Sequence, residues 1–159
     1  MLDGEYPIER FDRYFTICYA VLDCVDGRLQ YSVAGHPAPV LLRADGSLEV
    51  LRAGGTIIGI GAPIPFEEEE LTLGAGDWLF LHTDGILECA GAGGELFGEQ
   101  RLHRTLLASH GEPLEAACDR VMSSLRRFGE GCPLQDDVTL LGIEFEGLSA
   151  GSLRSDARR

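Results

Sequence analysis

Two Asp-Gly dipeptides, each set between short apolar segments, constrain the fold of this chain more than any other feature. They are Asp26-Gly27 and Asp45-Gly46. Asp-Gly between two apolar runs is a strong signal for a β-hairpin, because the tight turn needs residues that adopt positive φ. The first third of the chain is therefore predicted to be a meander of short antiparallel strands, with a buried first strand. The strands are expected at residues 14–22, 28–34, 39–43 and 48–51.

The remaining sequence predicts two more strands, two helices and a closing strand. A glycine- and proline-rich loop at 54–65 is followed by a half-exposed strand at 66–73 and by a strand at 77–83 that is apolar on both faces. Leucines at helical spacing predict a helix over 99–109, and a second helix is expected to open at Pro113 and end at Gly129. The last strand is expected at 138–145. This order indicates an α+β fold with mainly antiparallel sheet.

Length and composition indicate one globular domain. The chain has 159 residues, of which 45% are apolar, so it can bury a core of its own. We expect a lead-in at 1–13, the domain at 14–146 and a disordered tail at 147–159. The net charge of −13 argues against binding to nucleic acid or to an anionic membrane surface.

The cysteines and the apolar segments indicate a cytoplasmic protein. Five cysteines without a C-x-x-C pair predict reduced thiols, and they argue against a disulfide framework or a zinc knuckle. The sequence contains no run of about 18 apolar residues, and its start does not resemble a signal peptide.

Carboxylates occur where two buried strands end and begin. Asp84 directly follows one strand, and Asp136 and Asp137 directly precede another. If these strands are antiparallel neighbours, Asp84 and Asp136 meet at one edge of the sheet, where a divalent cation would relieve the repulsion between them. Ligands that are all oxygen favour Mg²⁺ or Mn²⁺, and Gly85 would allow a sharp turn. The alternative is that these aspartates only form turns or helix caps.

Five segments in the same order resemble one known family. GDWLFLHTDGILE at 76–88 is similar to the GD-x-L-x-L-Y-T/S-DG-I/L-x-E segment of SpoIIE/RsbU-like phosphatases, and QDDVTLLGIEF at 135–145 is similar to their closing DD-x-T-L-L motif. YSVAGHPAPVLLRADG at 31–46 matches their strand–AGHPP–strand segment. Two shorter segments also match, GGTIIGI at 54–60 and FGEQRL at 97–102. The chain therefore resembles the SpoIIE/RsbU-like branch of the metal-dependent serine/threonine protein phosphatases.

The resemblance implies a fold, an activity and a site. The fold is two packed antiparallel sheets flanked by helices, as in phosphatase 2C. The activity is hydrolysis of phosphoserine or phosphothreonine on a regulatory protein of the anti-anti-sigma type, with two Mn²⁺ or Mg²⁺ ions that activate water. Asp84 and Asp136 are implied as metal ligands, and no catalytic residue is expected beyond these ligands. Four more residues are expected to orient the ligands or to lie behind them: Gly85, Asp137, Glu88 and His36.

One motif of the family is missing. Such phosphatases carry an earlier Asp-Gly-His-Gly type segment whose aspartate bridges both metals. The upstream acids lack that context; they are Asp3, Glu5, Glu9 and Asp12. The expectation is an N-terminally truncated domain with little activity alone and with an exposed sheet edge through which it forms homo-oligomers. The alternatives are a non-catalytic pseudophosphatase that binds proteins in sigma-factor signalling, and an acidic α+β domain without a metal.

Overall fold

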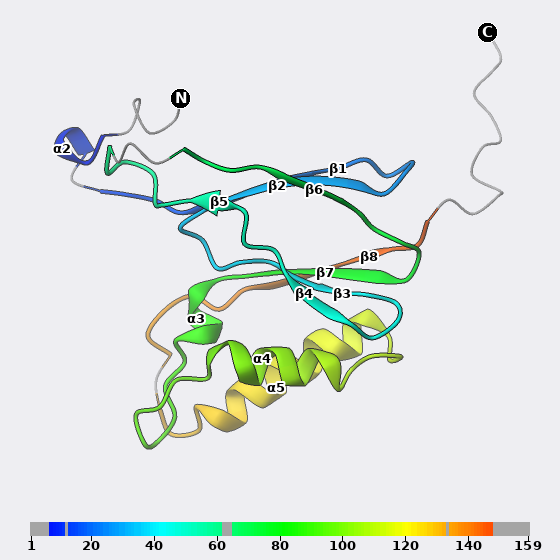
Figure 1. Ribbon diagram of the computed structural model, residues 1–159. Helices are drawn as coiled ribbons and strands as arrows, with labels where there is room; N and C mark the ends of the chain where they lie inside the picture. The colour runs from blue at the N-terminus through cyan, green and yellow to red at the C-terminus, as the bar shows by residue number, and fades with distance from the viewer. Residues whose placement is uncertain (1–6, 12, 62–64, 133, 148–159) are drawn as a thin grey trace, which may run out of the picture.

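The fold consists of two stacked sheets with a pair of helices on one side. The computed structural model describes residues 7–11, 13–61, 65–132 and 134–147. The two four-stranded sheets lie face to face, and the helices cover the outer face of the lower sheet in Figure 1. This architecture confirms the expected α+β class with two packed sheets. Residues 148–159 of the tail predicted at 147–159, and residues 1–6 and 12 of the lead-in predicted at 1–13, lie outside the described residues.

The first sheet is built around a hairpin. Strands β1 (Ile17–Leu22) and β2 (Arg28–Ala34) are antiparallel and join at the predicted turn, where Gly27 has a φ of 76°. β6 (Glu69–Thr72) pairs antiparallel with β2, and the two-residue β5 (Gly54–Gly55) pairs parallel with it. The strand order is therefore β1-β2-β5, with β6 also on β2.

The second sheet is entirely antiparallel. Its order is β4 (Leu48–Val50), β3 (Val40–Leu42), β7 (Asp77–His82) and β8 (Leu140–Phe145). The β3–β4 hairpin turns at the second predicted position, where Gly46 has a φ of 85°. β7 lies inside the sheet between β3 and β8 and is almost wholly buried, as its two apolar faces predict.

The two long helices agree with the predicted ones. α4 (Gly98–Leu107) and α5 (Leu114–Phe128) are amphipathic, and α5 is capped by Pro113 and Gly129. A one-turn helix, α2 (Ile8–Phe11), precedes the strands. α4 and α5 pack on the second sheet alone, so in the described part of the chain the expectation of flanking helices holds for one sheet only. Within the described ranges, no helix has both the length and the apolarity needed to cross a bilayer.

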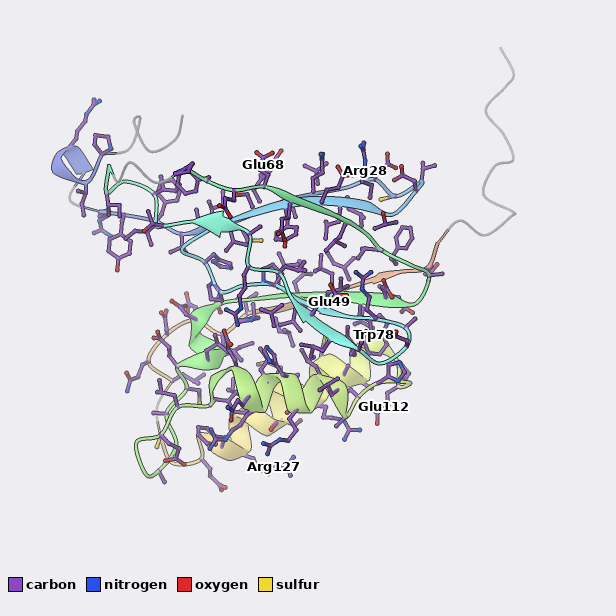
Figure 2. The ribbon with its side chains drawn as sticks, in the orientation of Figure 1. Arg28, Glu49, Glu68, Trp78, Glu112 and Arg127 are labelled. Carbon is purple, nitrogen blue, oxygen red and sulfur yellow. The ribbon has the colours of Figure 1, made fainter. Side chains whose placement is uncertain are left out.

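Two apolar cores follow from this layering. One lies between the sheets and includes Leu29, Tyr31 and Leu79. The other lies between the second sheet and the helices and includes Phe80 and Leu106. Because successive residues of β7 alternate between the two cores, the second sheet is buried on both faces. In Figure 2, Trp78 lies on the helix side of this sheet, whereas Arg28 and Glu68 lie on the outer side of the first sheet.

The prediction of a buried first strand was wrong. β1 begins at Ile17, and its side chains are exposed or half-buried, with Tyr19 63% and Val21 47% exposed. Cys18 and Leu22 pack against the core between the sheets, while the alternate residues point away from it. Among the described residues β1 pairs with no strand except β2 and carries no helix on its outer face. The apolar run therefore marks an edge strand.

Besides α2, which lies within the predicted lead-in, two short elements were missed. β5 forms within the predicted loop at 54–65 because its backbone pairs with the end of β2. A one-turn helix, α3 (Asp84–Leu87), begins where β7 was expected simply to stop. Each element spans only about one period, with four residues in α3 and two in β5, so their sequences carry no repeating pattern.

A buried aspartate, Asp77, connects the β3–β4 hairpin to the turn that precedes β7. Asp77 is 4% exposed, and its carboxylate accepts hydrogen bonds from Arg43 Nη1 at 2.9 Å, from the Gly74 amide at 2.8 Å and from the Ala44 amide at 2.8 Å. Arg43 also donates to Glu49 at 2.8 Å, and this bond is the main cause that raises the pKa of the guanidinium. Removing Asp77 would therefore leave three donors around a buried position without their acceptor.

Asp77→Ala is expected to lower the free energy of unfolding by about 3 kcal/mol, because it breaks a largely buried ion pair and leaves its partners unsatisfied. Urea denaturation followed by circular dichroism measures this change. Asp119→Ala, on the exposed face of α5, is the control and should change stability by less than about 0.5 kcal/mol. Equal effects of the two substitutions would contradict the assignment of Asp77 as a structural anchor.

Candidate metal centre

The candidate site lies where β7 ends and β8 begins. The two strands are antiparallel, with His82 opposite Leu140, and the ladder continues through a bond of 3.1 Å from the Thr83 amide to the Thr139 carbonyl. The segment after β7 therefore lies beside the segment before β8. This confirms the pairing on which the predicted meeting of Asp84 and Asp136 depended.

Gly85 brings these two segments into contact. A Cβ atom on Gly85 would lie 2.4 Å from the Asp137 carbonyl oxygen and 3.4 Å from the Asp136 carbonyl carbon. Real Cβ atoms do not approach a backbone oxygen so closely, so only glycine allows this contact. Gly85 is not among the residues with positive φ. Its place in the motif therefore follows from close packing rather than from the sharp turn expected from the sequence.

The Thr83 hydroxyl holds the same contact from the other side. Its Oγ1 donates to the Asp137 carbonyl at 2.8 Å and accepts from the Thr139 amide at 2.9 Å. Thr83 thereby satisfies two backbone groups of the chain that leads into β8. Sequence reasoning missed this residue, although it directly precedes Asp84 in the HTDG run.

Asp84 lines a cavity of about 570 Å³ between the two sheets' ends. Its side chain is exposed, and Oδ1 accepts from the Gly85 amide at 3.1 Å. Glu88 and His36, both predicted to support the site, line the same cavity. The Glu88 amide caps α3 by donating to the Asp84 carbonyl at 2.8 Å, and His36 Nδ1 lies 3.3 Å from Thr16 Oγ1.

Asp136 and Asp137 line a different cavity, of about 760 Å³, beside the end of α5. Asp136 Oδ1 accepts from the Asp137 amide at 2.7 Å, and both residues are exposed. Cys89 and Arg126 lie in the wall of this second cavity. The backbones of the two motifs thus touch, whereas Asp84 lines one cavity and Asp136 and Asp137 line another.

The carboxylates of the site are of the chemical type that a hard divalent cation prefers, but there are too few of them to complete its coordination shell. Carboxylate oxygens are the ligands that Mg²⁺ and Mn²⁺ favour. The described part of the chain contains no group of three or more His, Cys, Asp or Glu side chains that could hold a metal ion. Two carboxylates leave most of an octahedral shell to be supplied by water or by other protein groups.

Sequence comparisons identify the relatives of this chain. The family model for Stage II sporulation protein E (SpoIIE) matches residues 2–146. Protein IcfG of Synechocystis sp. is 28% identical over 130 residues, which cover 82% of this chain and 20% of IcfG. Phosphoserine phosphatase RsbP of Bacillus subtilis is 27% identical over 137 residues, which cover 86% of this chain and 32% of RsbP. The chain therefore spans a third or less of these curated relatives.

Solved structures agree with that relationship. The RsbU and RsbW domains of Rv1364c from Mycobacterium tuberculosis superpose with a TM-score of 0.67 at 29% identity, over 81% of this chain and 35% of that one. The phosphatase domain of SpoIIE from Bacillus subtilis has the same fold, with a TM-score of 0.67 at 18% identity, over 84% of this chain and 60% of that one. Since the family model covers nearly the whole sequence, the chain belongs to the SpoIIE family, the SpoIIE/RsbU-like branch of the metal-dependent serine/threonine protein phosphatases.

Proposed function

We propose that this chain is part of a phosphatase that removes phosphate from phosphoserine or phosphothreonine on a regulatory protein of the anti-anti-sigma type. The observation that carries the proposal is the contact between the Asp84 and Asp136 motifs, held by Gly85 and by the Thr83 hydroxyl. The name of the relative RsbP, a phosphoserine phosphatase, supports the substrate class. We place the protein in the cytoplasm, since its five cysteines are free.

In this proposal Asp84 and Asp136 hold Mn²⁺ or Mg²⁺. When bound, such ions acidify a water molecule and stabilise the charge of a transferring phosphoryl group. Gly85 keeps the two motifs in contact, and Asp137 receives the Thr83 hydrogen bond through its carbonyl. Glu88 and His36 line the cavity beside Asp84, where they orient the water or the ligands.

A second candidate is a non-catalytic protein-binding module in sigma-factor signalling. The observation in its favour is that the described residues contain no cluster of three potential metal ligands. A single ion held by two carboxylates binds weakly and cannot act as a pair of bridged ions. The two candidates differ in whether the Asp84 site binds a cation at all.

Titration with Mn²⁺, monitored by electron paramagnetic resonance, distinguishes the phosphatase from the binding module. We expect one weak binding event in the 159-residue chain, and Asp84→Asn or Asp136→Asn should weaken it at least about tenfold, because a charged ligand is lost. Asp119→Asn, an exposed carboxylate on α5, is the control and should leave the titration unchanged. Identical Mn²⁺ titrations for the unmodified chain and the three variants would favour the binding module over the phosphatase.

We also propose that the chain associates with a second copy through β1. Tyr19 and Val21 are exposed on the outer face of the first sheet, opposite Ser32 and Gln30 of β2. In the described part of the chain, the other side of β1 pairs with no strand. An apolar edge strand with unpaired backbone groups is a template for pairing with another chain.

Val21→Lys is therefore expected to make the chain more monomeric, because a charge on an edge strand opposes pairing. Size-exclusion chromatography with light scattering should show a mass that rises with concentration for the unmodified chain and a constant monomer mass for the variant. Leu141→Lys is the control, since Leu141 is an exposed apolar residue on β8, at the edge of the other sheet. Loss of association in Leu141→Lys alone would assign the contact to β8 instead.

A further inference from the structure

The cavity beside Asp84 contains one guanidinium among three carboxylates, together with the imidazole of His36. Asp84, Glu88 and Glu99 contribute carboxylates to its lining, and Arg52 is the only Lys or Arg among the described residues that line it. A phosphorylated ligand that entered this cavity would meet three carboxylates and one guanidinium. The three carboxylates repel a phosphate until a cation is bound, and Arg52 supplies the guanidinium that opposes this repulsion.

The backbone around Arg52 is held in place by buried neighbours and hydrogen bonds. Its neighbours Leu51 and Ala53 are both buried, and the chain around it is held by bonds of 2.9 Å from the Leu51 amide to the Pro39 carbonyl and from the Val33 amide to the Ala53 carbonyl. Residues alternate between the two faces of an extended segment, so Arg52 points away from the core that buries its neighbours. The backbone thus positions the side chain at the cavity wall.

The guanidinium itself is only loosely held. Arg52 Nη2 donates to Glu99 Oε2 at 2.9 Å, and the side chains are 60% and 45% exposed. Exposed ion pairs of this kind contribute little to stability, so exchanging the partner has a small cost. A guanidinium has five N–H donors, and in the described part of the chain Arg52 uses one of them. As far as the described residues are concerned, four donors remain for a ligand.

We propose that Arg52 is the phosphate-binding residue of this cavity, and that Glu99 holds its guanidinium until a phosphorylated segment of the substrate protein arrives. Two parallel N–H donors of arginine match two oxygens of a phosphate, a geometry that lysine cannot reproduce. The phosphate would displace Glu99 and lie in the cavity that Asp84 also lines. This inference rests on the proposed function, because it assigns a substrate contact of the same site.

Calorimetric titration with O-phosphoserine, in the presence of Mg²⁺, tests the inference. Arg52→Gln should weaken binding by about 10- to 100-fold, the effect of losing a bidentate charge-assisted hydrogen bond. Arg52→Lys should bind O-phosphoserine more tightly than Arg52→Gln but more weakly than the unmodified chain. Lysine keeps the positive charge but cannot donate two parallel N–H bonds. Glu99→Gln should tighten binding, since it removes the competing carboxylate from Arg52. Free serine should not bind measurably to any of the proteins.

Arg104→Gln is the matched control, because Arg104 is exposed on α4, the helix that carries Glu99, and does not line the cavity. If Arg104→Gln and Arg52→Gln weaken O-phosphoserine binding equally, net charge explains the effect and the inference is wrong. Unchanged binding in Arg52→Gln would also overturn it. Thermal unfolding of each variant should match that of the unmodified chain, since the Arg52–Glu99 pair is exposed.

The Mn²⁺ titration distinguishes failure of this inference from failure of the proposed function. Arg52→Gln should leave Mn²⁺ binding unchanged, because the guanidinium is not a metal ligand. Mn²⁺ binding that depends on Asp84, together with normal O-phosphoserine binding by Arg52→Gln, would reject Arg52 and retain the phosphatase. A phosphate site that depends on Arg52, without any Mn²⁺ binding, would support this inference and point to a phosphoprotein-binding module instead.

Discussion

The isolated 159-residue chain is expected to release phosphate from a phosphoserine protein at the background rate, even with Mn²⁺ present. The described residues contain no cluster of three potential ligands, so no pair of bridged ions can form on them alone. Adding a polypeptide with the Asp-Gly-His-Gly type segment of SpoIIE-like phosphatases should raise the rate about 100- to 1,000-fold. That increase corresponds to the several kcal/mol by which bound metal ions stabilise a transition state.

The assay measures phosphate release against time, with and without the added polypeptide. The control is the same polypeptide with its motif aspartate replaced by asparagine, which should bind the chain but restore no activity. Robust Mn²⁺-dependent turnover by the chain alone would contradict the prediction. It would mean that a ligand outside the Asp84 and Asp136 motifs is already present in this sequence.

Asp84→Asn is expected to lower the restored activity about 100- to 1,000-fold, back to the background rate, while leaving the fold and the assembly intact. The substitution removes a ligand charge, whereas Asp84 is exposed and is not a member of either apolar core. Phosphate release and size-exclusion chromatography on the same samples measure the two effects. Asp119→Asn serves as the control for the loss of one surface carboxylate and should retain full activity.

Asp84→Asn is expected to have the same circular dichroism spectrum as the unmodified chain. With the fold unchanged, a fall in activity reports the loss of Asp84 as a metal ligand. Retained activity in a folded Asp84→Asn protein would remove Asp84 from the metal site. The same pair of measurements on Asp136→Asn tests the second proposed ligand independently.

Local signals in the sequence were sufficient for much of the fold. The hairpin turns at Gly27 and Gly46 were predicted correctly because positive φ is a property of the turn residues themselves. The ends of α5 were predicted from Pro113, whose fixed φ suits the start of a helix, and from Gly129, which follows its last residue. Each of these features depends on residues that are close in sequence, and no distant contact was needed to recognise it.

For the candidate site, the sequence predicted only that the Asp84 segment and the Asp136 segment lie side by side. The motifs placed Asp84 after one strand and Asp136 before another, and the β7–β8 pairing confirmed that these strands are antiparallel neighbours. The contact between Gly85 and Asp137 and the two hydrogen bonds of Thr83 could not be predicted, because they join residues more than 50 positions apart. The metal-binding roles themselves stay predictions.

The sequence by itself determined the hairpins, the long helices, the order of the elements and the family of this protein, since each is encoded in neighbouring residues or in ordered motifs. Only the tertiary structure decided which apolar residues are buried and which charged residues share a cavity. The apolar run that contains Tyr19 became an edge strand, and Arg52 came to line the cavity of Asp84. Burial and cavity lining depend on the elements that pack against a segment, and the residues of the segment alone do not specify those elements.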